Sequence, residues 1–93
     1  MVFEWDERKN KRNYSKHRIR FERAILVWED EKRLVRYDVS HSGNEDRWQV
    51  IGWSGTVLFI VFTEITDERI RIISARRANK REQYEYYKEY DFR

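Results

Sequence analysis

The chain contains no cysteine, so it can form neither a disulfide nor a thiolate metal site. Zinc would need histidine and carboxylate ligands, and the only histidines are His17 and His41. We therefore expect no metal site and no cofactor. No apolar run approaches the roughly 20 residues that cross a bilayer, and Met1 leads into Phe3–Asp6 without the apolar core of a secretory signal. These absences favour a protein of the reducing cytoplasm.

The length and composition predict one compact unit. Ninety-three residues suffice for a single domain, residues 1–93, with one core. Aromatic residues make up 16% of the chain, and each one that is buried removes about 150–250 Å² from water. Charged residues make up 40%, so much of the surface must carry ions of both signs.

The net charge of +3 conceals a strong segregation of charges along the chain. Seven Lys or Arg residues lie between Arg8 and Arg20 with no acid among them, and six lie between Arg69 and Arg81. The acids concentrate in residues 29–46. Two such runs on one small domain can form a basic face that binds a polyanion. Each run alone is more typical of a solvated helix or strand face.

Three helices are predicted. Asp6 is a suitable N-cap for a basic helix over residues 7–16. A second helix over residues 20–28 would present one apolar face, formed by Phe21, Ala24, Ile25 and Trp28. A third helix begins near Asn79, where Asn79 and Glu82 have the spacing of a capping box.

Three strands are predicted at residues 47–53, 56–63 and 69–75, with a tight turn at Ser54–Gly55 joining the first two. Residues 34–39 could add a short edge strand, and residues 40–46 have the composition of a loop. The middle strand is continuously apolar, so it should be buried on both faces. The expected fold class is α+β, with two N-terminal helices packed on an antiparallel three- to four-stranded sheet and a C-terminal helix.

Alternation along the strands predicts which residues share a face. If Trp48, Val50, Ile70 and Ile72 form the core face, then the opposite face carries Arg47, Gln49, Arg69 and Arg71. Arginine forks match phosphate oxygens in bidentate geometry, which indicates RNA as a ligand. Alternatively, these arginines form ion pairs with acids such as Glu64 or Glu82.

RNA can be cleaved when its own 2′-hydroxyl attacks the adjacent phosphate, and this reaction needs a base, an acid and stabilisation of negative charge. Arg71 and Arg76 are the candidates for a phosphate clamp, although Arg76 has the other strand parity. His17 is the acid–base candidate, with a helix-terminal role as the alternative. The candidates for RNA binding are Lys9, Lys16, Arg47, Arg69, Arg77 and Tyr86. Tyr86 could instead pack on the sheet.

Several blocks of the sequence resemble one known family. They are Phe3-Glu4-Trp5-Asp6, Lys16-His17, and Arg69-Ile70-Arg71-Ile72-Ile73-Ser74-Ala75-Arg76-Arg77-Ala78 followed by Glu82 and Tyr86. The chain is similar to the BrnT toxins of type II toxin–antitoxin systems over nearly its whole length. The resemblance implies a RelE-like fold and a ribonuclease that halts translation. It also implies a ribbon-helix-helix antitoxin, BrnA, that binds the toxin directly. The toxin would contact operator DNA only through its complex with this antitoxin.

The residues themselves leave a second hypothesis open. A basic face without a recognisable triad, phosphate loop or metal cluster could belong to a non-catalytic module that binds RNA or an acidic protein partner. Such a module would associate in a salt-sensitive manner and yield no cleaved products.

Overall fold

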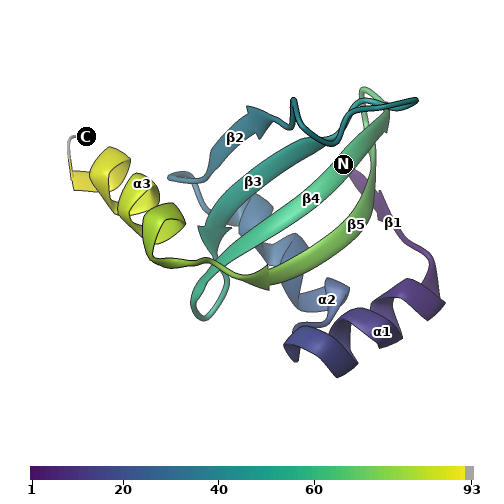
Figure 1. Ribbon diagram of the computed structural model, residues 1–93, viewed down its shortest axis with the longest axis horizontal. Helices are drawn as coiled ribbons and strands as arrows, with labels where there is room; N and C mark the ends of the chain where they lie inside the picture. Colours follow the sequence, from purple (N-terminus) through teal and green to yellow (C-terminus); the bar gives the residue numbers. More distant parts are fainter. Residues whose placement is uncertain (92–93) are drawn as a thin grey trace.

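The computed structural model describes residues 1–91, and side chains as far as Lys88. A five-stranded sheet with the order β1-β5-β4-β3-β2 forms its centre (Figure 1). The elements are β1 (Val2–Glu4), α1 (Glu7–His17), α2 (Phe21–Ala24), the 3-10 helix η1 (Ile25–Glu29), β2 (Leu34–Tyr37), β3 (Trp48–Trp53), β4 (Val57–Thr66), β5 (Arg69–Arg77) and α3 (Lys80–Asp91).

The sheet differs from the prediction in one strand. Strands β2 to β5 form the expected antiparallel meander, and β2 is the predicted edge strand. However, β1 adds a fifth strand that runs parallel to β5, with Glu4 opposite Arg71. The sheet is therefore mixed rather than purely antiparallel. Three residues are too few to show the alternation that identifies a strand, so sequence patterns missed β1.

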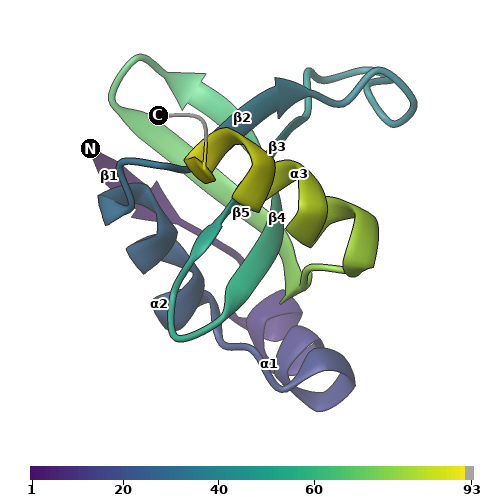
Figure 2. The same cartoon turned by 90° about the vertical axis from the view of Figure 1, so that its left-hand side faces the viewer.

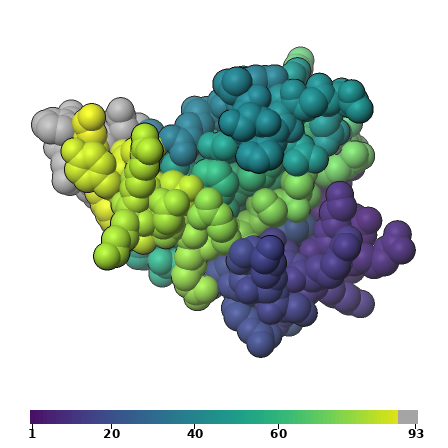
Figure 3. All heavy atoms as spheres, in the orientation of Figure 1, coloured from purple at the N-terminus to yellow at the C-terminus, as the bar shows by residue number. Residues whose placement is uncertain are grey.

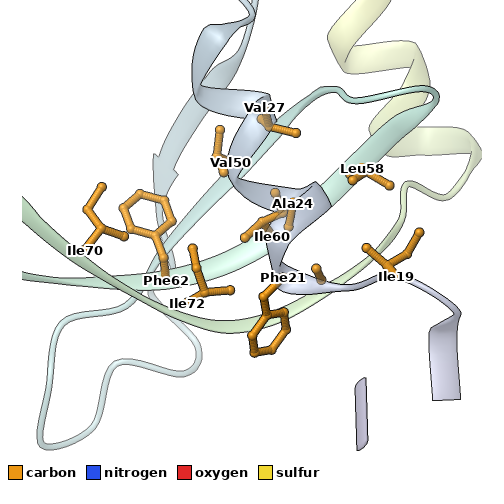
Figure 4. Packing of buried hydrophobic residues seen from close by; sticks show 11 residues of the cluster. Ile19, Phe21, Ala24, Val27, Val50, Leu58, Ile60, Phe62, Ile70 and Ile72 are labelled. Carbon is orange, nitrogen blue, oxygen red and sulfur yellow. The ribbon is translucent and has the colours of Figure 1, made fainter. Parts of the chain in front are cut away.

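The helices cover the two faces of the sheet unequally, as Figure 2 shows. Helices α2 and η1 pack on one face, over the core in Figure 4, and α1 packs against β5. This core includes the predicted residues Val50, Ile70 and Ile72, with Trp48 packed against it. Its other buried members are Ile19, Phe21, Ala24, Val27, Leu58, Ile60, Phe62 and Ala75.

A smaller apolar cluster lies on the opposite face, beneath α3. Ile51, Val57 and Phe59 of the sheet meet Ala78 and Tyr86 there. Strand β4 thus contributes buried side chains to both clusters, which confirms the expectation from its continuous apolar run. The second cluster covers only part of its face, so the rest of that face is left for polar and charged side chains.

The ends of the helices follow the predicted local chemistry. Asp6 caps α1 by accepting a hydrogen bond from the Arg8 backbone N–H at 2.8 Å. Asn79 and Glu82 form a reciprocal capping box, with both bonds at 2.8 Å. The predicted second helix is α-helical only to Ala24 and continues as η1. The tighter 3-10 turn brings Val27 into the core three residues after Ala24, and both are fully buried.

The turn at Ser54–Gly55 joins β3 to β4 as predicted, and Gly55 adopts a positive φ of 73°. Gly52 is required for packing, because a Cβ atom there would lie 2.5 Å from Cγ1 of Val27. No helix among residues 1–91 is both long and apolar enough to span a membrane.

Candidate functional site

A groove crosses β5 where α1 meets the uncovered part of the sheet. It consists of two adjoining hollows of about 230 and 410 Å³ that share Ile73 and Ser74. In Figure 3 the purple-blue surface of α1 adjoins the green surface of β5. The first hollow is also lined by Lys9, Arg12, Asn13, Lys16 and His17. The second is also lined by Asp38, His41, Arg47, Gln49, Phe59, Val61 and Arg76.

An irregularity in β5 determines which arginines face this groove. Val61 pairs with Ser74, but its neighbour Phe62 pairs with Ile72, so Ile73 is an extra residue in β5. A bulge reverses strand parity beyond it. The strict alternation used above placed Arg76 on the core face, which is wrong, because the bulge brings Arg76 to the same face as Arg71.

Two buried asparagines fix α1 against β5. The Asn13 side chain accepts a hydrogen bond from the Ala75 N–H at 3.1 Å and donates to the Ala75 carbonyl at 2.8 Å. It also donates to the Ile19 carbonyl, and Asn10 accepts a hydrogen bond from the Phe21 N–H. A buried amide with all its partners specifies one position for the helix. These structural roles were not visible in sequence, where Asn10 and Asn13 are two polar residues in a polar run.

The anchored helix presents a cluster of cations along the groove. Lys9, Arg12 and Lys16 follow one another at intervals of three and four residues, so they share one side of α1. All three are exposed, and among the described residues none of them pairs with a carboxylate. We call Lys9, Arg12 and Lys16 the helix cations.

His17 ends α1 and lies next to the helix cations. Burial lowers the pKa of His17 below its usual value of 6.5, and the positive charges of Lys16 and Arg76 lower it further. The imidazole is therefore mainly neutral near pH 7, which suits a general base more than an acid. Arg77 is exposed and reaches the His17 carbonyl with a donor–acceptor distance of 3.4 Å.

The other predicted arginines do not gather at one point. Arg69 and Arg71 both bind Glu4 of β1, at 3.2 and 2.9 Å, and neither lines the groove. Arg71 and Arg76 are five positions apart, or about 16 Å of extended strand. The predicted alternative of ion pairing is therefore correct for Arg69 and Arg71, although the acid is Glu4 rather than Glu64.

Arg76 and Arg47 line the groove but also have acidic neighbours. Arg76 forms a bidentate pair with Glu82, with N–O distances of 2.8 and 2.9 Å, and its guanidinium lies 4.2 Å from the centre of the Phe59 ring. Burial would raise the pKa of Glu82, but the hydrogen bonds from Arg76 and the Asn79 backbone outweigh it and hold this pKa below its usual value. Arg47 lies 3.8 Å from the Glu45 carboxylate.

Tyr86 cannot stack on a nucleotide base in this structure. Its side chain is buried in the cluster beneath α3, and its hydroxyl donates a 2.7 Å hydrogen bond to Asp30. The alternative prediction, packing on the sheet, describes Tyr86 correctly. We leave it out of the candidate RNA-binding surface.

One pair of residues in the groove, Asp38 and His41, was not predicted from the sequence. The His41 ring nitrogen Nδ1 lies 3.1 Å from Oδ1 of Asp38, a buried residue. Burial raises the pKa of Asp38, but hydrogen bonds from the side chains of His41 and Gln49 outweigh it, so the net shift is downward. The sequence signal for this pair is an Asp three residues before a His. It was not recognised because the surrounding residues have the composition of a loop. Among residues 1–91, no group of three or more potential ligands could hold a metal ion.

Comparison with known proteins agrees with this architecture. The sequence profile of the family described as "ribonuclease toxin, BrnT, of type II toxin-antitoxin system" matches residues 5–82. The chain belongs to the BrnT family. The crystal structure of the ribonuclease toxin BrnT of Brucella abortus superposes with a TM-score of 0.66 at 25% sequence identity, covering 86% of this chain and all of that one. A search of curated proteins found no match.

The BrnT match spans every element from α1 to β5. It begins at Trp5, just before the Asp6 cap, and ends at Glu82, the residue that pairs with Arg76. The groove and all its lining residues therefore fall within the matched region. The membership identifies the chain as one of a family of ribonuclease toxins.

Proposed function

We propose that this chain is an endoribonuclease toxin that cleaves RNA in the cytoplasm without a metal ion and thereby inhibits translation. The observation that carries the proposal is the groove over the β5 bulge. It combines three unpaired helix cations with a histidine whose pKa is lowered. Cations that have no carboxylate partner can bind phosphate without first breaking an ion pair.

In this mechanism the helix cations hold the RNA backbone. The neutral imidazole of His17 accepts the 2′-hydroxyl proton, and the 2′-oxygen attacks the adjacent phosphorus. Negative charge grows on the phosphate oxygens during the attack. Arg76 stays cationic throughout and stands within electrostatic range of His17, so it stabilises this charge. Its pairing with Glu82 fixes its position in advance.

We further propose that a BrnA-like antitoxin with a ribbon-helix-helix region neutralises the chain by direct binding, and that only this complex contacts operator DNA. The family's membership of type II systems supports a protein antitoxin as the partner. Co-expression with the product of a neighbouring ribbon-helix-helix gene should relieve growth arrest and yield a complex that co-purifies.

The central experiment uses purified protein and an end-labelled RNA. We expect internal cuts that leave 2′,3′-cyclic phosphate ends, with unchanged rates in EDTA. His17→Asn should slow cleavage by about 10²–10⁴-fold. Lys88→Ala, on the exposed surface of α3, is the matched control and should cleave at the wild-type rate.

Expression of the wild-type chain without an antitoxin should arrest growth and fragment cellular RNA, whereas His17→Asn should permit growth. Soluble wild-type protein that binds RNA in a salt-sensitive manner but never cuts it would favour the alternative, a non-catalytic binding module. Cleavage by His17→Asn at the wild-type rate would remove His17 from the mechanism.

A further inference from the structure

His41 lies in the second hollow of the groove, in the segment between β2 and β3. It shares that hollow with Arg76, and Arg76 in turn lowers the pKa of His17. Arg76 is therefore a neighbour of both histidines of the chain. The mechanism above leaves the 5′-oxygen that departs from phosphorus without a proton donor.

The segment that carries His41 is fixed by hydrogen bonds. The Asp38 N–H donates to the Arg47 carbonyl at 2.8 Å and closes the loop at its base. Inside the loop, the Ser42 hydroxyl donates to the Asp38 carbonyl at 2.6 Å and accepts from the Arg47 N–H at 2.9 Å. The Thr63 hydroxyl of β4 donates to the Asp46 carbonyl at 2.7 Å. These bonds place His41 over the sheet.

The contact with Asp38 determines how the His41 ring is used. An ionised carboxylate only accepts hydrogen bonds, so His41 Nδ1 must carry the hydrogen. The other ring nitrogen, Nε2, has no hydrogen-bond partner among the described residues. The His41 side chain is 70% exposed, whereas that of Asp38 is 5% exposed. A buried carboxylate thus orients an accessible imidazole, the arrangement that holds a proton-transfer histidine in one tautomer.

We propose that His41 is the second proton-transfer group of the ribonuclease reaction and that Asp38 is its positioning residue. This inference rests on the function proposed above. As the bond between the 2′-oxygen and phosphorus forms, His17 takes the 2′-hydroxyl proton. His41 starts the reaction with a proton on each ring nitrogen, and the Nδ1–H faces Asp38. As the bond between phosphorus and the 5′-oxygen breaks, Nε2 gives its proton to that oxygen and leaves the neutral Nδ1–H ring. The products are a 2′,3′-cyclic phosphate and a 5′-hydroxyl, and solvent restores both histidines.

The charges around His41 suit this role. Besides Asp38, the charged groups that line the same hollow are Arg47 and Arg76. Two guanidinium groups attract the scissile phosphate, while Asp38 balances the charge of the ring when it is protonated. The phosphate is thereby drawn between His17 and His41, with Arg76 beside it.

Chemical rescue tests whether His41 transfers a proton. His41→Ala should lower the cleavage rate about 100-fold or more, and added imidazole should restore part of the activity, because the exposed site admits it. Ser40→Ala, in the same segment and also exposed, is the control and should cleave at the wild-type rate. Far-UV circular dichroism of each variant checks that the fold is kept.

The variant Asp38→Asn tests whether Asp38 orients His41 for proton transfer or only stabilises the loop. It retains an oxygen acceptor for the His41 N–H but removes the negative charge, so kcat should fall roughly tenfold or more while KM for RNA is unchanged. A change confined to KM would overturn the positioning role.

The outcomes distinguish the two proposals. If wild-type protein fails to cleave RNA, the ribonuclease proposal falls, and this inference with it. If wild-type protein cleaves and His41→Ala cleaves equally fast, or loses activity that imidazole does not restore, only the role of His41 is overturned.

Discussion

The cations of α1 and the arginines of the sheet carry the same charge but have different surroundings. Arg69, Arg71 and Arg76 each bind a carboxylate within 3.2 Å, whereas the helix cations pair with no acid in the described part of the chain. The sheet arginines thus already have a ligand, and the helix cations do not. A run of arginines in a strand therefore indicates structural ion pairs as much as ligand binding. The helix cations of α1 are the better candidates for contacts with phosphate.

The sheet arginines also differ from one another, which leads to the largest expected effect. Glu82 is 7% exposed, so Arg76→Ala would leave a buried carboxylate without its partner and lower the free energy of unfolding by about 2–3 kcal/mol. Arg71→Ala should destabilise the protein much less, because Glu4 is more accessible and keeps Arg69. Urea denaturation measures both losses.

A double variant provides the control for this comparison. Adding Glu82→Gln to Arg76→Ala removes the orphaned charge and should recover part of the lost stability. Equal losses for Arg71→Ala and Arg76→Ala would contradict the distinction between a buried and an exposed ion pair.

The helix cations should dominate RNA affinity. Replacing Lys9, Arg12 and Lys16 by alanine should weaken binding of a non-cleavable 2′-O-methyl RNA about tenfold or more at low salt, and should reduce the slope of log affinity against log salt by about 2. The matched control replaces Lys80, Arg81 and Lys88 of α3, which removes the same net charge. Equal losses from both triple variants would mean that net charge, rather than the groove, determines binding.

Local patterns predicted most of this fold because the decisive interactions were local. The Asp6 cap, the capping box of Asn79 and the Gly55 turn each depend on residues a few positions apart. Alternation likewise predicted the core face of β3 and β5. Strand β1 was not predicted, because its pairing with β5 joins residues more than sixty positions apart.

The site was less predictable than the fold. One extra residue at Ile73 reverses the parity of β5, and its only trace in the sequence is that two isoleucines, Ile72 and Ile73, follow one another. The pairing of Arg71 with Glu4 depends on the missed strand β1. The role of His41 depends on a loop conformation that composition alone does not specify. Long-range geometry, rather than residue type, therefore decided which candidates came together.

The buried pair of Arg76 and Glu82 should also make stability depend on pH. The pKa of Glu82 in the folded protein lies below its ordinary value of 4.5, so its ion pair contributes fully above pH 4.5. That contribution disappears as the pH falls through the lowered pKa, because the carboxylate becomes protonated. Glu82→Gln should therefore flatten the acid side of a plot of unfolding free energy against pH. The control variant Glu64→Gln, at an exposed position, should leave the plot unchanged. An unaltered curve for Glu82→Gln would contradict the assignment.

The smallest expected effect links the helix cations to the chemistry of His17. The pKa of His17 lies below 6.5 in the free protein, so the acid limb of kcat/KM against pH should also lie below 6.5. Lys16→Ala removes one of the positive charges that lower this pKa, so the limb should move toward higher pH. Lys11→Ala removes the same charge from a residue outside the groove and should leave the limb in place. A shift of equal size in both variants would show that overall charge, and not the neighbouring ammonium group, sets the titration of the base.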